Sequence, residues 1–155
     1  MGEVTISNPY GPIDPQRLAA FEARIGSPLP DQFRRFLARY NGAELTPCEL
    51  VLPGQPEPFT LLSRTFGLHG ADGDLSVAYD NCQDIIPAEL LAFAEDYGGN
   101  LFCIGVRGEC RGRVYFWDHH LSHPGDEEPN WDGLTLLAGS FDSFVVHLGR
   151  EQPGG

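Results

Sequence analysis

The sequence contains no lysine, so all ten of its basic residues are arginines, against 22 aspartates and glutamates. The formal net charge is −12 at pH 7, and the sequence pI is near 4.6. A chain this acidic is repelled by the phosphates of nucleic acids and by anionic lipid headgroups. The composition therefore argues against direct binding to nucleic acid or to a membrane.

Long apolar runs are also missing, since no segment approaches the roughly 20 apolar residues that span a bilayer. The N-terminus has no basic region followed by an apolar stretch, so it does not resemble a signal peptide. The cysteines show neither C-x-x-C spacing nor the companion histidine pattern of a zinc site, and this predicts buried free thiols. They are Cys48, Cys82, Cys103 and Cys110. We expect a cytoplasmic protein without a metal or other cofactor.

Basic residues are absent from two long stretches that are rich in acids. Residues 65–106 contain seven acids and residues 114–149 contain six, and neither stretch has a basic residue. Two explanations are open: a solvated surface that maintains solubility, or an acidic face that attracts a basic protein. The candidates for contact with such a partner are Asp72 and Asp74 in one loop, Asp126, Glu127 and Glu128 in another, and Trp131 as an aromatic anchor.

The most informative stretch is residues 97–120, where two short apolar runs are separated by residues rich in glycine and charge. The runs are 101–106 and 114–117, and their spacing predicts a β-hairpin. Side chains alternate across a strand, so apolar residues at nearly every position make both faces apolar. We expect this hairpin in the middle of a sheet, with other elements packed on each face.

Helices are predicted on either side of a region of strands. Asp14-Pro15 provides an N-cap and first residue for a helix closed by Gly26, and a second helix begins at Leu29-Pro30-Asp31 and ends at Asn41-Gly42. Further predicted helices are a short one capped by Asp74 and a last one that follows Ser140. Predicted strands are 49–52, 59–62 and 134–137, whereas the composition of 89–96 favours helix and its alternation permits a strand.

This order predicts an α+β fold: a single domain with a mainly antiparallel sheet, two N-terminal helices and a C-terminal helix. We expect one domain over residues 1–155, with a core at about 13–149 and loose termini.

A series of short motifs resembles the SUKH superfamily, in the branch related to the fungal Smi/Knr cell-wall assembly regulators. Each motif is weak alone, and their order makes the resemblance specific. The motifs are Phe21-Glu22 with Ile25-Gly26, Leu29-Pro30 with Phe36-Leu37 and Asn41-Gly42, Phe66-Gly67-Leu68, Ile86-Pro87, Gly99-Asn100, Val114-Tyr115-Phe116 with Asp118-His119, and Leu137-Ala138 before Ser140-Phe141-Asp142-Ser143-Phe144.

The resemblance implies an α+β fold, a strand at 89–94, and no catalysis. Bacterial members look like immunity proteins that bind and neutralise a cognate toxin of contact-dependent or polymorphic systems, often a nuclease. A basic effector domain is therefore the partner we expect, because an acidic protein can associate quickly with a surface built for nucleic acid. The fungal branch implies an alternative, an interaction scaffold that regulates cell-wall synthesis.

An enzyme is the remaining alternative. Asp118-His119-His120 follows a predicted strand, with His123 four residues after His119 and Asp72-Gly73-Asp74 upstream. These residues look like the paired motifs of DHH phosphoesterases, in which carboxylates and histidines hold metal ions that activate water. The absence of basic residues to hold a phosphate argues against this alternative. The oligomeric state is not predicted by any of these features.

Overall fold

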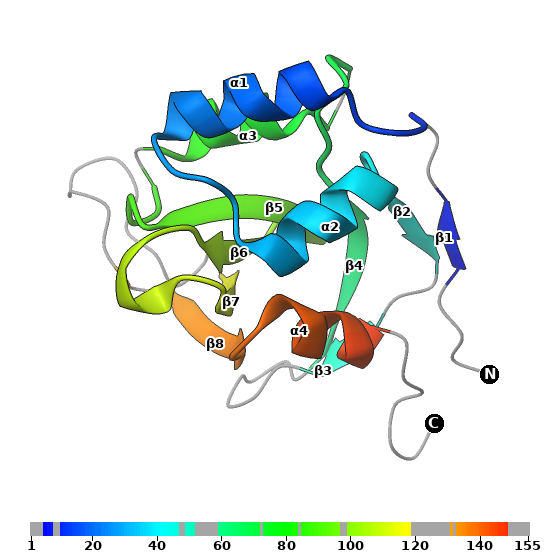
Figure 1. The fold of residues 1–155 in the computed structure, drawn as a ribbon. Coiled ribbons are helices and arrows are strands. Elements are labelled where there is room, and N and C mark those ends of the chain that lie inside the picture. The colour runs from blue at the N-terminus through cyan, green and yellow to red at the C-terminus, as the bar shows by residue number, and fades with distance from the viewer. Residues whose placement is uncertain are drawn as a thin grey trace.

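The computed structural model describes residues 5–7, 10–46, 49–51, 59–71, 73–83, 85–96, 99–118, 131 and 133–148. Within these residues eight strands form one antiparallel sheet in the order β1-β2-β4-β5-β6-β7-β8, and β3 pairs with the first half of β4 (Figure 1). The strands are β1 (Thr5–Ser7), β2 (Glu44–Thr46), β3 (Glu49–Val51), β4 (Phe59–Thr65), β5 (Leu90–Asp96), β6 (Leu101–Gly105), β7 (Val114–Trp117) and β8 (Leu134–Ala138). The predicted α+β class is confirmed.

Four described helices begin and end where local chemistry predicted. They are α1 (Pro15–Ile25), α2 (Asp31–Arg39), α3 (Leu75–Cys82) and α4 (Phe141–Leu148). The Asp14 carboxylate caps α1 by accepting a hydrogen bond from the Gln16 N–H (2.9 Å), and Gly26 closes it at φ 77°. The Ser140 hydroxyl caps α4 by accepting a bond from the Ser143 N–H (3.2 Å). The predicted starts of α1, α3 and α4 are confirmed because side-chain caps depend only on near neighbours, whereas α2 begins after Pro30 without a side-chain cap.

The central hairpin lies inside the sheet, as predicted. β6 pairs with β7 in the register Phe102↔Phe116 and Cys103↔Tyr115, while β5 and β8 flank the pair. Phe102 and Phe116 belong to one buried cluster, and Cys103 and Tyr115 belong to another. Since these residues alternate along the strands, the two clusters lie on opposite faces of the sheet. We call the face with Phe102 the helix face and the face with Tyr115 the second face.

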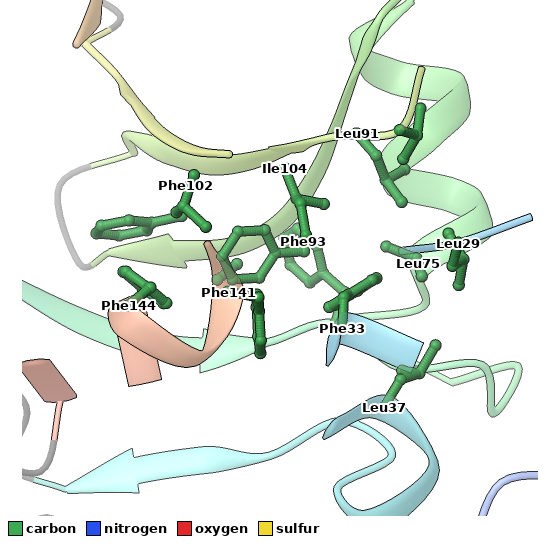
Figure 2. Packing of buried hydrophobic residues seen from close by; sticks show 14 of the residues in the cluster. Leu29, Phe33, Leu37, Leu75, Leu91, Phe93, Phe102, Ile104, Phe141 and Phe144 are labelled. Atoms are coloured by element: carbon green, nitrogen blue, oxygen red, sulfur yellow. The ribbon is translucent and has the colours of Figure 1, made fainter. Parts of the chain in front are cut away.

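The centre of the helix face is a group of phenylalanines from three elements (Figure 2). The Phe93 ring of β5 lies 5.5 Å from the Phe33 ring of α2, 5.4 Å from that of Phe141 and 5.6 Å from that of Phe144, centroid to centroid. The last two rings belong to α4. Edge-on aromatic contacts of this kind add to the free energy of burial. Phe93 therefore joins α2 and α4 to the sheet.

Strand β5 confirms the strand that the family resemblance implied at residues 89–94, although the composition of this stretch favours a helix. The strand pairs on one side with β4 and on the other with β6, with a register shift between Ala92 and Ala94. Burial at almost every position gives these alanines and leucines apolar neighbours on both faces. Tertiary pairing thus outweighs intrinsic helix propensity here.

Two elements were absent from the prediction, namely the three-residue strands β1 and β2. They pair with each other from Thr5↔Thr46 to Ser7↔Glu44, and β2 then joins the end of β4 at Arg64. Strands this short contain too few residues for alternation to be recognised. Only their pairing identifies them.

The basic cluster at the hairpin tip has a structural role. The Arg107 Nη2 donates to the carbonyl of Ile25 (2.6 Å), and the Arg111 Nη1 donates to the carbonyls of Pro28 (2.8 Å) and Val106 (2.6 Å). The hairpin tip contains three arginines, Arg107, Arg111 and Arg113, and the first two fasten the tip to the junction between α1 and α2. Arg113 is exposed.

Candidate protein-binding surface

An exposed aromatic and aliphatic patch lies on the second face of the sheet. Trp131 is 43% exposed, and its ring meets the Tyr115 ring edge-on at 5.3 Å between centroids. Leu136 of β8 is 48% exposed and is the cross-strand partner of Tyr115. We call the exposed Trp131 and Leu136, together with the buried Tyr115 that both adjoin, the Trp131 patch. Tryptophan and tyrosine are the residues that most often dominate binding energy at interfaces.

The acidic residues of the predicted loop precede Trp131 in the sequence. Asp126, Glu127 and Glu128 lie outside the described residues, but both ends of their segment are defined. The Asp118 N–H donates to the Gly133 carbonyl (2.9 Å), and the Leu134 N–H donates to the Trp131 carbonyl (3.2 Å). Residues 118 and 131 therefore both lie at the end of the β7–β8 pair where β8 begins.

Asp74, a second predicted contact residue, is largely buried and bonded within its own loop. Its carboxylate is 6% exposed and accepts hydrogen bonds from the N–H groups of His69 (3.1 Å), Gly70 (2.6 Å) and Ser76 (2.8 Å), as well as from the Ser76 hydroxyl. It caps α3 as predicted, and its bonds to His69 and Gly70 hold the preceding loop in place. Asp72 lies outside the described residues.

Asp74 gives a testable pH dependence. Burial opposes ionisation of its carboxylate, but the hydrogen bonds from the Ser76 hydroxyl and from the N–H groups of Gly70, Ser76 and His69 outweigh it and lower the pKa below 3.8. A lowered pKa in the folded state adds stability that is present above pH 3.8 and is lost as the pH falls through the folded value. We expect Asp74→Asn to cost about 1 kcal/mol at pH 7, because the amide offers one acceptor oxygen where the carboxylate uses two, and progressively less at more acidic pH. Urea unfolding of both proteins at pH 7 and pH 3 measures this, and an equal difference at the two pH values would contradict it.

The described residues contain no group of side chains that supports the enzyme alternative. Among them, no three histidine, cysteine, aspartate or glutamate side chains gather where they could hold a metal ion. Asp118 is described, whereas His119, His120 and His123 lie outside. The described cysteines are buried free thiols, as predicted, and burial raises the pKa of Cys82 to about 11 and that of Cys103 well above 9.0. Protonated thiols of this kind are poor nucleophiles.

The motifs behind the family resemblance turn out to be structural. The Leu68 N–H donates to Asn41 Oδ1 (2.6 Å), which joins the end of α2 to the chain that follows β4. Gly67 packs against this junction so closely that an added Cβ would lie 2.6 Å from the Asn41 carbonyl carbon and would overlap the Gly42 nitrogen. Sequence reasoning could find the family through these residues but could not find a binding site through them.

The sheet, its layer of helices and this interlocked junction define a small α+β domain on which Trp131 and Leu136 are exposed next to Tyr115. Residues 12–147 match the SMI1 / KNR4 family (SUKH-1), and the chain belongs to that family. It is also 30% identical over 149 residues to the "SPbeta prophage-derived uncharacterized protein YokK" of Bacillus subtilis (strain 168). The aligned region covers 86% of this chain and 73% of that relative. None of the described helices has the length and apolar character needed to cross a membrane.

Proposed function

We propose that this protein is an immunity protein that binds a basic toxin domain and blocks it without catalysing a reaction. Membership of the SMI1 / KNR4 family and similarity to a prophage-derived relative both fit an immunity-type protein. The observation that carries the proposal is the exposure of Trp131 and Leu136, with Trp131 three residues after the acidic run 126–128 in the sequence of a chain with a net charge of −12.

The proposed complex forms in two physical steps. Long-range attraction between the acidic protein and a basic effector domain speeds their encounter, and salt weakens this attraction. The Trp131 patch then provides apolar contact area that is released from water on binding. A nuclease-type effector is the partner that best fits, because its substrate requires a basic surface that an acidic protein can cover.

The first test is capture of the partner from a lysate of the source organism at low and at high salt. We expect a single basic protein that is retained at low salt and weakened at high salt. Produced alone, that protein should arrest growth, and co-production of this chain should restore growth. Capture of a protein that is harmless by itself would contradict the proposal.

The acidic segment provides a sharper prediction. Changing Asp126, Glu127 and Glu128 together to serine should slow association with the captured toxin about tenfold at low salt, with little effect at high salt. Stopped-flow or surface-binding kinetics measure this rate.

A matched control removes three negative charges elsewhere, from exposed residues on α2, β2 and the hairpin tip. These are Asp31, Glu44 and Glu109. If local attraction matters, the control should reduce the association rate much less than the triple change in the acidic segment. Equal reductions would show that only the net charge matters, and the proposed contact would then be wrong.

A further inference from the structure

Strand β8 is the last strand of the sheet, and in the described part of the chain no strand pairs with its outer edge (Figure 1). Its neighbour β7 is buried at all four positions, whereas four of the five residues of β8 remain at least partly exposed. An edge of this kind presents backbone N–H and C=O groups that can pair with another strand.

The sequence of β8 contains few of the features that usually prevent such pairing. Leu134–Ala138 reads Leu-Thr-Leu-Leu-Ala and has neither a charged residue nor a proline. A register irregularity against β7 lies between Val114 and Tyr115, toward the end of β8. The first three residues of the strand pair regularly with Trp117, Phe116 and Tyr115. At the other end of the sheet, β1 has only three residues and offers a much shorter edge.

The charges around β8 select the kind of strand that can approach. Asp118 lies next to its beginning, bonded to Gly133, and the exposed Asp142 follows its end. Arg111 also lines a depression beyond that end, together with Gly139 and Ser140, and it donates to backbone carbonyls there. Residues 114–149 contain six acids and no basic residue. A second copy of this chain would bring these acids together, whereas a basic strand would be attracted.

We propose that the toxin docks by adding an extended strand to the outer edge of β8. This strand alternates apolar and basic residues, so that its apolar side chains meet Leu136 and Trp131 while its basic side chains face the surrounding acids. Backbone hydrogen bonds supply affinity in strand addition of this type, and pockets for alternate side chains supply specificity. The inference rests on the proposed function and names the chemistry of the partner segment.

A synthetic probe tests the edge without the toxin. The probe is a blocked peptide of about seven residues that alternates arginine with valine. Its control has the same sequence with N-methylated valines, which keeps charge and side chains but removes hydrogen-bond donors along one edge. We expect the unmethylated peptide to shift the amide NMR signals of residues 134–138 and to slow their hydrogen exchange. The methylated peptide should bind at least about tenfold more weakly.

Two single substitutions locate the contact. Leu136→Lys removes the exposed leucine of β8 and places a positive charge opposite the peptide, so we expect at least about tenfold weaker binding. Val77→Lys is the matched control, because Val77 is 54% exposed on α3 and the substitution adds the same charge there. It should bind the peptide as the unchanged protein does. Circular dichroism of both variants confirms that they are folded.

Three results would overturn the inference. They are equal binding of both peptides, signal changes confined to residues outside 131–138, and concentration-dependent self-association in sedimentation that already protects the β8 amides in the free protein. None of these results would change the outcome expected from the toxin capture experiment. Conversely, failure to capture a toxin would remove the proposed function while a positive peptide result still established the open edge.

Discussion

Replacing Phe93 with alanine is expected to lower the free energy of unfolding by about 3–5 kcal/mol. The ring is fully buried and packs against the rings of Phe33, Phe141 and Phe144. Its removal leaves a cavity between the sheet, α2 and α4, and each of these elements loses contact with the others. At a chain length of 155 residues such a loss should lower the melting temperature by about 10 °C or more.

Two further variants make this measurement specific. Phe93→Leu keeps part of the apolar volume, so its cost in a denaturant titration should be clearly smaller than that of alanine. Val77→Ala shortens an exposed side chain on α3 and should change stability by no more than about 0.5 kcal/mol. If Phe93→Ala were no worse than Val77→Ala, the aromatic group would not hold the helices to the sheet.

The second large effect is expected from Gly105→Ala, at the end of β6. The hairpin tip folds back over this glycine: the Gly105 N–H donates to the Arg113 carbonyl (2.9 Å), and the Gly112 N–H donates to the Gly105 carbonyl (2.8 Å). A Cβ at this position would overlap the carbonyl oxygen of Cys110 and lie 2.9 Å from its sulfur. Because the obstruction is backbone, the tip would have to move, and we expect a cost of about 3 kcal/mol or more.

Gly139→Ala provides the control for this change. Gly139 follows β8, and a Cβ added there meets no atom within 4 Å. The same chemical substitution should therefore leave the midpoint of thermal unfolding nearly unchanged. A comparable loss in both variants would mean that glycine flexibility, and not the close approach of the tip, explains the effect at Gly105.

The sequence predicted that the hairpin is buried, but it did not predict the close approach of the tip to Gly105. The apolar run at 101–106 showed that the hairpin would be buried on both faces, and the alternation of Phe102 with Cys103 showed which side chains share a face. That Gly105 lies under the tip depends on how the eight residues between β6 and β7, 106–113, fold back. Turn-forming composition predicted a turn there but did not specify its path.

The candidate surface shows the same division. Trp131 was predicted as an aromatic anchor, and it is exposed, as is Leu136; its contact with a partner stays a prediction. Asp74 was predicted both as a helix cap and as a partner contact, and the structure uses its carboxylate for the cap and for the loop from His69 to Ser76. At the hairpin tip, Arg107 and Arg111 bind carbonyl groups near the end of α1, and their positions in the sequence did not indicate these partners.

The sequence by itself determined the helix caps, the two-sided burial of the central hairpin and the α+β class. These features depend on residues a few positions apart, whose interactions are the same in any fold that contains the segment. Only the tertiary structure decided that 90–96 is a strand, that β1 and β2 pair, that Asp74 is enclosed and that β8 ends the sheet. Each of these depends on segments distant in the chain, because their burial and hydrogen bonds arise only when those segments meet.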